Sequence, residues 1–527
     1  MLRDHQVRQL EKDPCKVWDI AVIGGGATGL GVAVDAASRG YDTLLLEQSD
    51  FAKGTSSRST KLVHGGVRYL AQGDISLVLE ALHERGLLRQ NAPHLVKNQA
   101  FIIPSYDWWE GPFYNIGMKV YDMMAGRLGL GPSEKISREA VLKAIPNLDE
   151  NHLNGGVIYY DGQFDDARLA VNLAQTAVEN GAVVLNYMTV IRILKDSQNL
   201  VCGLEAVDKE SGKVHTIRSR VVVNATGVFA DAILHMDDPG AKPILRPSQG
   251  IHVVLDASFL QGDSAIMIPK TSDGRVLFAV PWHGKVVVGT TDTPLQPGEA
   301  SLEPRALDQE IEFIFSTASQ YLKKDPGPED VLSVFAGLRP LAAQEENQDQ
   351  STKEISRSHK VLVSLSGLIT ITGGKWTTYR KMAEDTVNRV WMVGGLAEKP
   401  CVTRDMPIHG YVKNTHFDTP GYFYGADRES INALIHDNPE LGEKLHPGYE
   451  YTRAQVVWAV RHEMARTVED FLARRIRMLL LDARVSMAMA PEVASIMARE
   501  LGQNAAWEQS QISGYRDLAA GYILTGP

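Results

Sequence analysis

Residues 19–47 constrain the fold more than any other stretch of the chain. They read DIAVIGGGATGLGVAVDAASRGYDTLLLE and begin with an apolar run of the kind that is buried on both faces of a parallel sheet. Gly24, Gly26 and Gly29 then form the pattern G-x-G-x-x-G, which opens a helix-like segment. A second apolar run ends at Glu47. This order of elements predicts a β-α-β unit and an α/β fold.

The glycines and the acid of this unit each have a physical role at a dinucleotide. Gly24 permits the sharp turn out of the strand, Gly26 lets a pyrophosphate approach the backbone, and Gly29 allows close packing of helix and strand. The free amide groups at the start of the helix attract phosphate, and the carboxylate of Glu47 is placed to accept hydrogen bonds from a ribose. We therefore predict a dinucleotide site, although the motif alone does not separate FAD from NAD.

Composition narrows the class of protein. The chain has 527 residues, enough for two to four domains, and a net charge of -10, which argues against a nucleic-acid partner. Cys15, Cys202 and Cys401 show no metal-like spacing, so we expect no metal site and a reducing compartment. Residues 1–17 are polar and are interpreted as an irregular extension without a secretory signal. The sequence contains no apolar run of about 18 residues, so no membrane-spanning helix is predicted. Attachment to a membrane surface stays open.

A polar loop at residues 51–70, FAKGTSSRSTKLVHGGVRYL, follows the β-α-β unit. Its many hydroxyl and basic side chains fit either a solvated loop or a loop that hydrogen-bonds a cofactor. The H-G-G triplet favours the second interpretation, because two glycines let the backbone pack against a flat group. The predicted cofactor contacts in this loop are Thr55, Ser56, Ser57 and Lys61.

Two distant turns favour FAD over NAD. A second buried strand, within residues 220–231, ends in an A-T-G triplet, which flavoproteins with two dinucleotide-binding domains often carry beside the cofactor. At residues 367–390 a strand, a Gly-Gly turn and a helix follow one another, and the positive end of that helix can face the electron-rich edge of a reduced flavin. The predicted cofactor contacts in these turns are Ala225, Thr226, Gly227, Gly373, Gly374, Thr377 and Thr378.

The rest of the chain divides by pattern. Short antiparallel strands between residues 250 and 291, with an Asp-Gly hairpin signal at 273–274, predict a separate substrate domain. Residues 342–358 are predicted to form an exposed loop, and the chain becomes helical after residue 400. The predicted domains are an FAD-binding domain at 18–90, 150–235 and 345–398, a substrate-binding domain at 91–149 and 236–344, and a helical C-terminal domain at 399–527.

Several local signals predict individual helices. Asp74 is expected to cap one helix, and Thr452 with Gln455 forms a capping box ahead of another. Pro491 fits the first turn of a third helix. Residues 101–130 are rich in aromatic side chains and methionine, which fits either core packing or a membrane-facing patch. The helix after the capping box is predicted to present one apolar face formed by Val456, Val460, Met464, Val468, Phe471 and Leu472.

Together these segments resemble the FAD-dependent glycerol-3-phosphate dehydrogenases. The similarity covers residues 18–395 in family order, and the tail sequence VRHEMARTVEDFLARRIRMLLLD resembles the accessory C-terminal domain of that family. The resemblance implies a Rossmann-like FAD-binding domain of the D-amino-acid-oxidase and glutathione-reductase type, an antiparallel-sheet substrate domain and an all-α C-terminal domain. The motifs that carry it are IGGGATGLG, GTSSRSTKLVHGGVRYL, QFDDARL, VNATGVFAD, VVVGTTDT, AGLRPL and ITGGKWTTYRKMAEDTV.

The resemblance implies oxidation of sn-glycerol 3-phosphate to dihydroxyacetone phosphate, with hydride transfer to FAD and passage of the electrons to a membrane quinone. It also implies a cytoplasmic protein attached peripherally to the inner face of the cytoplasmic membrane, and a homodimer stays open. The alternatives are a peroxide-forming oxidase that uses oxygen, and a flavin-binding protein without this turnover. The chain is short for the long insertion of the oxidase branch, and its tail has no Asp-rich calcium loop, so a dehydrogenase without calcium regulation is favoured.

That chemistry needs a grip on a phosphate dianion, a base for a hydroxyl proton and a positive charge near the flavin. Because a guanidinium binds phosphate through paired N–H groups, Arg339 of AGLRPL is the predicted main phosphate ligand, with Arg68 of HGGVRYL also in the pocket. Lys375 matches the family lysine near the flavin, and His64 is either the base or a packed histidine. The implied catalytic residues are His64, Arg68, Arg339 and Lys375, and Tyr69, Thr291 and Asp292 are further substrate contacts.

Overall fold

The computed structural model describes most of the chain. It leaves out residues 72, 108–109, 270, 272–275, 297, 343–357 and 525–527, together with the side chains of Arg68 and Ala71. The hairpin signal at 273–274 and nearly all of the loop predicted at 342–358 therefore lie outside the described residues. The side chain of Arg68, a predicted substrate contact, also lies outside them.

Strand β1 runs through the centre of an eight-stranded sheet and pairs in parallel with β2 and β10. Ile20 and Val22 pack on the face that α2, α7 and α10 cover, whereas Ala21 and Ile23 pack on the other face with β8 and β9. This alternation explains why the whole strand is apolar, and it confirms the predicted β-α-β unit. The strands are β1 Val17–Ile23, β2 Thr43–Leu46, β7 Val183–Leu185, β8 Met188–Lys195, β9 Val201–Asp208, β10 Val214–Asn224, β17 His359–Val363 and β18 Ile369–Gly373, and the helices are α2 Ala27–Ser38, α7 Asp166–Glu179, α8 Ala230–Asp237 and α10 Tyr379–Val393.

A second, ten-stranded sheet carries the predicted antiparallel segment, with β11 paired to β14 and β16. β3 and β6 also belong to it, although they fall in ranges assigned to the FAD-binding domain, because β6 pairs along its length with β4. The domain boundaries stay a prediction. The strands are β3 Leu62–Val63, β4 Val96–Ser105, β5 Glu134–Ser137, β6 Gly155–Phe164, β11 Ser248–Asp256, β12 Ala265–Ile268, β13 Leu277–Trp282, β14 Lys285–Gly289, β15 Thr293–Pro294 and β16 Val331–Arg339.

One of the helices connected to this sheet, α4, begins directly after the residue that the sequence predicts as its cap. The carboxylate of Asp74 accepts a hydrogen bond from the backbone N–H of Leu77, so the predicted cap of α4 is confirmed. None of the helices among the described residues has the length and apolar character needed to cross a bilayer. These helices are α3 Val67–Ala71, α4 Ile75–Asn91, α5 Glu110–Ala125, α6 Arg138–Ala144 and α9 Asp308–Ala318.

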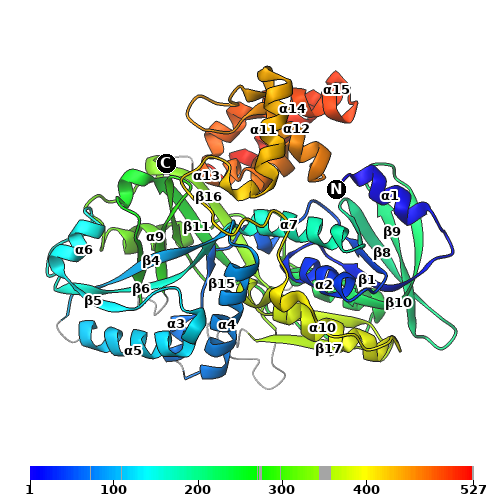
Figure 1. Cartoon of the computed structure of the whole chain (residues 1–527), viewed down its shortest axis with the longest axis horizontal. Helices are drawn as coiled ribbons and strands as arrows, with labels where there is room; N and C mark the ends of the chain where they lie inside the picture. The colour runs from blue at the N-terminus through cyan, green and yellow to red at the C-terminus, as the bar shows by residue number, and fades with distance from the viewer. Residues whose placement is uncertain are drawn as a thin grey trace.

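The C-terminal helices gather on one side of the two sheets, where Figure 1 shows them in orange and red. The capping box of Thr452 and Gln455 is confirmed at the start of α12. Two predictions are wrong: α12 ends at His462 because Met464 has a positive φ of 54°, and Pro491 lies inside α14. The predicted single apolar face is therefore split between α12 and later segments. The helices are α11 Asp427–Asp437, α12 Arg453–His462, α13 Met478–Leu481, α14 Ala483–Leu501 and α15 Ala505–Ala520, with a π-helical segment at Asp470–Arg475.

The N-terminal residues are also more ordered than predicted. Helix α1, Arg3–Glu11, packs beside β7, and its Leu10 is buried in the core on the outer face of the first sheet. The guanidinium of Arg3 is buried and lies 2.6 Å from the carboxylate of Asp208. The prediction of an irregular extension is wrong because these long-range contacts stabilise a helix whose own sequence is largely polar.

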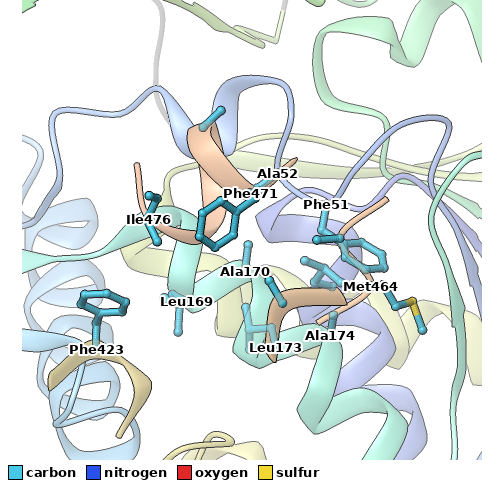
Figure 2. Packing of buried hydrophobic residues seen from close by; sticks show 14 of the residues in the cluster. Phe51, Ala52, Leu169, Ala170, Leu173, Ala174, Phe423, Met464, Phe471 and Ile476 are labelled. Atoms are coloured by element: carbon cyan, nitrogen blue, oxygen red, sulfur yellow. The ribbon is translucent and has the colours of Figure 1, made fainter. Parts of the chain in front are cut away.

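Helix α7 joins the first sheet to the C-terminal helices. Figure 2 shows Leu169 and Leu173 of α7 among apolar side chains from the loop after β2 and from the C-terminal segment. Phe51 from that loop and Phe471 from the π-helical segment are both fully buried. Each such side chain contributes roughly 1.5–3 kcal/mol on burial. The C-terminal segment is therefore packed directly on the loop that leads toward the candidate site.

Candidate active site

The turn from β1 into α2 has room only for glycine at two of its positions. A Cβ atom on Gly29 would lie 1.9 Å from the carbonyl oxygen of Gly24, and one on Gly24 would lie 2.6 Å from the carbonyl oxygen of Ala225. Gly24 also has a positive φ of 110°, which favours glycine. The turn of β1, the start of α2 and the end of β10 are thus pressed together, as the sequence motif predicts.

A cavity of about 370 Å³ opens beside this turn. Its wall brings together segments that are more than 300 residues apart in the chain. The predicted cofactor contacts at this wall are Gly24, Gly26, Glu47, Thr55, Ser56, Ala225, Thr226, Gly227, Gly373 and Gly374, and Lys375 lies there too.

Two smaller cavities continue from the first, with volumes of about 210 and 180 Å³. The middle cavity shares Thr55 and Lys375 with the first, and it shares His64, Tyr69 and Arg339 with the outer one. The three cavities therefore adjoin one another, with shared residues in the walls between them. The predicted substrate contacts Thr291 and Asp292 line the outer cavity with His64, Tyr69 and Arg339.

Arg339 ends β16 and is fixed at the wall of the outer cavity. One terminal nitrogen donates to Thr290 Oγ1 and to the carbonyl oxygen of Thr291, both at 2.7 Å. The other lies 3.1 Å from the carboxylate of Asp292. A Cβ atom on Gly250 would lie 2.2 Å from the guanidinium, so the neighbouring strand makes space for it. The second nitrogen also donates to the Gln249 carbonyl oxygen at 3.1 Å, so the planar group is held in one orientation by acceptors of the protein itself.

Comparison with known proteins identifies the family. A model described as FAD dependent oxidoreductase matches residues 19–380, and one described as the C-terminal domain of alpha-glycerophosphate oxidase matches residues 369–511. The mitochondrial glycerol-3-phosphate dehydrogenase of Schizosaccharomyces pombe is 38% identical, covering 96% of this chain and 87% of that protein. The chain belongs to the FAD-dependent glycerol-3-phosphate dehydrogenase family.

Further comparisons agree with this family assignment. The human mitochondrial glycerol-3-phosphate dehydrogenase is 38% identical, with 95% of this chain and 72% of that protein covered. The solved glycerol-3-phosphate dehydrogenase from Bacillus halodurans, complexed with FAD, is similar with a TM-score of 0.76 and 29% identity, covering 99% of this chain and 98% of that one. The predicted fold class and the predicted cofactor, FAD, are confirmed for this flavoenzyme.

The residues of the first cavity fit FAD. A Cβ atom on Gly26 would meet only Ser56 Oγ, at 3.1 Å, so the backbone there is open to a phosphate. The carboxylate of Glu47 lies at the end of β2 and accepts hydrogen bonds from the amides of Gly25 and Ser49, at 2.6 and 2.8 Å. Burial raises the pKa of Glu47 above its usual value, although these two amides oppose the shift. Its contact with a ribose stays a prediction.

Four other predicted contacts do not line these cavities: Gly29, Ser57, Lys61 and Thr378. The ammonium group of Lys61 is fully buried, 2.7 Å from the carboxylate of Asp166, and it also donates to the carbonyl oxygen of Ser57. From this buried position Lys61 holds the loop in shape, and its contact with the cofactor stays a prediction. Thr378 is buried and donates to the carbonyl oxygen of Lys375. Neither Ser57 nor Thr378 lies at a wall of the three cavities, whereas Thr377 lines the middle one.

Asp161 and His252 are among the polar residues at the cavity walls that sequence reasoning did not assign to the site. Asp161 lines the outer cavity and lies 2.6 Å from the guanidinium of Arg85. His252 lines the middle cavity, with Nε2 2.9 Å from Thr60 Oγ1, and burial lowers its pKa well below the usual value. The signal at His252 is a polar residue within the apolar run IHVVL, and the signal at Asp161 is an acidic residue directly after the run VIYY. Among the described residues, no cluster of three or more His, Cys, Asp or Glu side chains is arranged to hold a metal ion.

Proposed function

We propose that this flavoenzyme oxidises sn-glycerol 3-phosphate to dihydroxyacetone phosphate and passes the electrons to a membrane quinone. The observation that carries the proposal is Arg339, which is fixed at the wall of both the outer cavity and the middle cavity, and the Gly373–Gly374 turn lines the middle cavity as well. A substrate with a phosphate at one end and a secondary hydroxyl in its middle suits that arrangement. The family names support the same substrate.

Arg339 binds the phosphate dianion in this proposal. Its guanidinium is planar, always charged and already oriented by Thr290, Thr291 and Asp292. Phosphate binding at the outer cavity then places the carbon atoms of the substrate toward the middle cavity. The predicted role of Arg68 as a second ligand of the phosphate stays part of the proposal.

His64 takes the hydroxyl proton in this proposal. It lines both the outer and the middle cavity, and the ordinary pKa of imidazole lies near neutral pH. FAD, when bound, supplies the acceptor for the hydride. Lys375 lines the first and middle cavities, with its ammonium group 3.9 Å from the ring centroid of Tyr69. In this proposal the positive charge of Lys375 stabilises the negative charge that develops on the cofactor as it accepts the hydride.

An anaerobic titration tests the substrate. The purified holoenzyme is mixed with glycerol 3-phosphate without oxygen, and the flavin absorbance is followed. Bleaching by this compound, and none by glycerol, is expected because the phosphate grip selects the substrate. A flavin-binding protein without turnover would keep its absorbance, and that result would reject the proposal.

The electron acceptor is tested on the same reduced sample. We expect fast reoxidation by a soluble quinone analogue and slow reoxidation by air. Fast reoxidation by air with release of hydrogen peroxide would instead assign the protein to the oxidase branch.

The outer surface of α5 supports peripheral attachment to the inner face of the cytoplasmic membrane. Phe113, Ile116, Val120 and Met123 follow the spacing of one helix face and are 60%, 67%, 42% and 81% exposed. Single exposed apolar residues are common, but a row of four on one helix favours contact with lipid. Co-sedimentation with phosphatidylglycerol–phosphatidylethanolamine vesicles at low salt tests this attachment, and protein that remains in the supernatant would refute it.

A further inference from the structure

The inner face of α5 contacts the loop that carries His64. Tyr121 is 1% exposed, and its hydroxyl oxygen lies 2.7 Å from the backbone nitrogen of Gly65. The same hydroxyl lies 2.8 Å from a carboxylate oxygen of Asp161. Gly65 directly follows His64 in the chain, so this hydroxyl contacts the backbone one residue from the proposed base.

Charge fixes the direction of these two hydrogen bonds. The other carboxylate oxygen of Asp161 lies 2.6 Å from the guanidinium of Arg85, and both side chains are 1% exposed. An ionised carboxylate only accepts hydrogen bonds, so the Tyr121 hydroxyl donates to Asp161 and its lone pair faces the N–H of Gly65. Burial, reinforced by the charge of Asp161, raises the pKa of Tyr121 well above its usual value. The hydroxyl therefore keeps its proton and is unsuited to act as a base.

The loop is held tightly at two consecutive residues. A Cβ atom on Gly65 would lie 2.5 Å from Leu82 of α4 and 2.6 Å from the Tyr121 hydroxyl, so the backbone is pressed onto both helices. The backbone N–H of His64 also donates to Thr377 Oγ1, at 3.3 Å. Consecutive amides are thus anchored to segments far apart in the sequence. Tyr121 itself does not line the outer cavity, whereas His64 and Asp161 do.

We propose that Tyr121 is a positioning residue for the oxidation: it holds the imidazole of His64 at the boundary of the outer and middle cavities through the amide of Gly65. The proposal rests on the function argued above, with His64 as the proton acceptor. A displaced loop moves the imidazole relative to the substrate hydroxyl, while Arg339 on β16 keeps its grip on the phosphate. Loss of the anchor should slow the chemical step more than it weakens substrate binding.

The test compares Tyr121→Phe with the wild-type holoenzyme. The substitution removes one hydroxyl and leaves the Gly65 amide without this acceptor. We expect the rate of anaerobic flavin reduction at saturating glycerol 3-phosphate to fall by about tenfold, with KM changed by less than about threefold and FAD content unchanged. Tyr106→Phe is the matched control, since its partly buried hydroxyl donates to the Asp149 carbonyl away from these cavities. That variant should reduce its flavin at the wild-type rate.

Hydrogen–deuterium exchange of the holoenzyme gives a second readout that needs no substrate. The peptide that contains Gly65 should be protected in the wild type and should exchange faster in Tyr121→Phe, while peptides of α14 stay unchanged. Rapid exchange of this peptide in the wild type would overturn the proposal even if the variant failed to fold. A wild-type rate of flavin reduction in Tyr121→Phe would overturn it as well. Failure of the wild type to bleach would refute the proposed function instead, so the two failures are distinguishable.

Discussion

Gly29 lies where α2 passes so close to the end of β1 that a side chain has no room. Because a Cβ atom would meet the Gly24 carbonyl oxygen at 1.9 Å, Gly29→Ala should force the cofactor turn open and yield protein with little bound FAD. Gly117→Ala is the matched control, since Gly117 also lies in a helix and its added Cβ would meet nothing within 4 Å. The control variant should bind FAD fully, and its free energy of unfolding should rise by up to about 1 kcal/mol, because alanine favours a helix more than glycine does. Flavin absorbance per protein measures both variants, and full occupancy in Gly29→Ala would contradict the argument.

Arg339 is the residue on which substrate selection depends. Arg339→Ala removes a charged, bidentate phosphate ligand, so KM for glycerol 3-phosphate should rise about 10- to 100-fold while FAD stays bound. Arg339→Lys keeps the charge but loses the planar pair of donors, and its KM should lie between those of the wild type and Arg339→Ala. Steady-state kinetics with a quinone analogue measure KM, and flavin absorbance checks cofactor content. An unchanged KM in Arg339→Ala would remove this residue from the phosphate grip.

At the scale of elements, α5 has two faces with separate roles. Its exposed apolar row can be changed without disturbing the buried Tyr121, so Ile116→Glu with Met123→Glu should weaken co-sedimentation with lipid vesicles. Flavin reduction by glycerol 3-phosphate should stay at the wild-type rate. Val214→Glu, on an exposed position of β10, is the control and should leave vesicle binding intact. Equal sedimentation of the double variant and the wild type would exclude α5 as the contact surface.

In the segment before α11, the side chain of His409 lies between two carboxylates. His409 Nδ1 lies 2.5 Å from Glu179 and Nε2 lies 2.8 Å from Asp427. Burial alone would lower the pKa of His409, but these hydrogen bonds outweigh it and raise the pKa to about 9. A raised pKa adds stability that is complete below the unfolded value of about 6.5 and is lost as pH rises through about 9.

This linkage predicts a pH-dependent effect of His409→Gln. The variant should be less stable than the wild type by roughly 1–3 kcal/mol at pH 6, and the difference should vanish near pH 10. Urea unfolding at several pH values measures it. His436→Gln, at an exposed position of α11, should be neutral throughout. A difference that stayed constant up to pH 10 would show that charge on His409 is not its cause.

Sequence signals correctly predicted the helix ends and turns that are determined by residues close by in the chain. The glycine turn and α2, the Asp74 cap of α4 and the capping box of α12 depend on neighbours within a few residues. The end of α12 depends on a distant residue. Glu463 forms a buried ion pair with Arg168, 2.8 Å away, and Met464, the next residue, has a positive φ. A periodic apolar pattern carries no information about such a distant partner. The prediction therefore continued the helix where the structure ends it.

The same division holds for the candidate site. His64, Arg339 and Lys375 could be predicted because each stands in a distinctive motif, and the structure brings all three to adjoining cavities. Asp161 and Tyr121 could not be connected to the site from sequence, since their roles arise only when β6 and α5 meet the His64 loop. Lys61 stands in the same motif as the cofactor contacts, but its neighbours in space turn it into the interior.

At the scale of the whole molecule, the C-terminal helices are joined to the cofactor loop by a buried carboxylate. Asp50 follows β2 and precedes Ala52 and Lys53, which line the first cavity. Its two oxygens lie 2.8 and 2.9 Å from the guanidinium of Arg475, and Arg474 lies at 2.5 Å. Burial alone would raise the pKa of Asp50, but the two arginines hold it well below its usual range. The carboxylate is therefore charged at any pH at which the enzyme is assayed.

Asp50→Asn should consequently weaken both the fold and the cofactor site. The change leaves Arg474 and Arg475 buried without this counter-charge, which costs about 3–5 kcal/mol when one partner of a buried pair is lost. Since the loop at 50–53 then loses its anchor, FAD should also dissociate faster. Thermal unfolding and the recovery of flavin fluorescence on dilution measure the two effects. Glu500→Gln is the control, because its partner Arg461 is half exposed at 50% and such pairs contribute only about 0–1 kcal/mol. Faster FAD loss without a lower unfolding temperature would place Asp50 in cofactor binding alone, and no change in either would mean that the C-terminal helices are held by apolar packing.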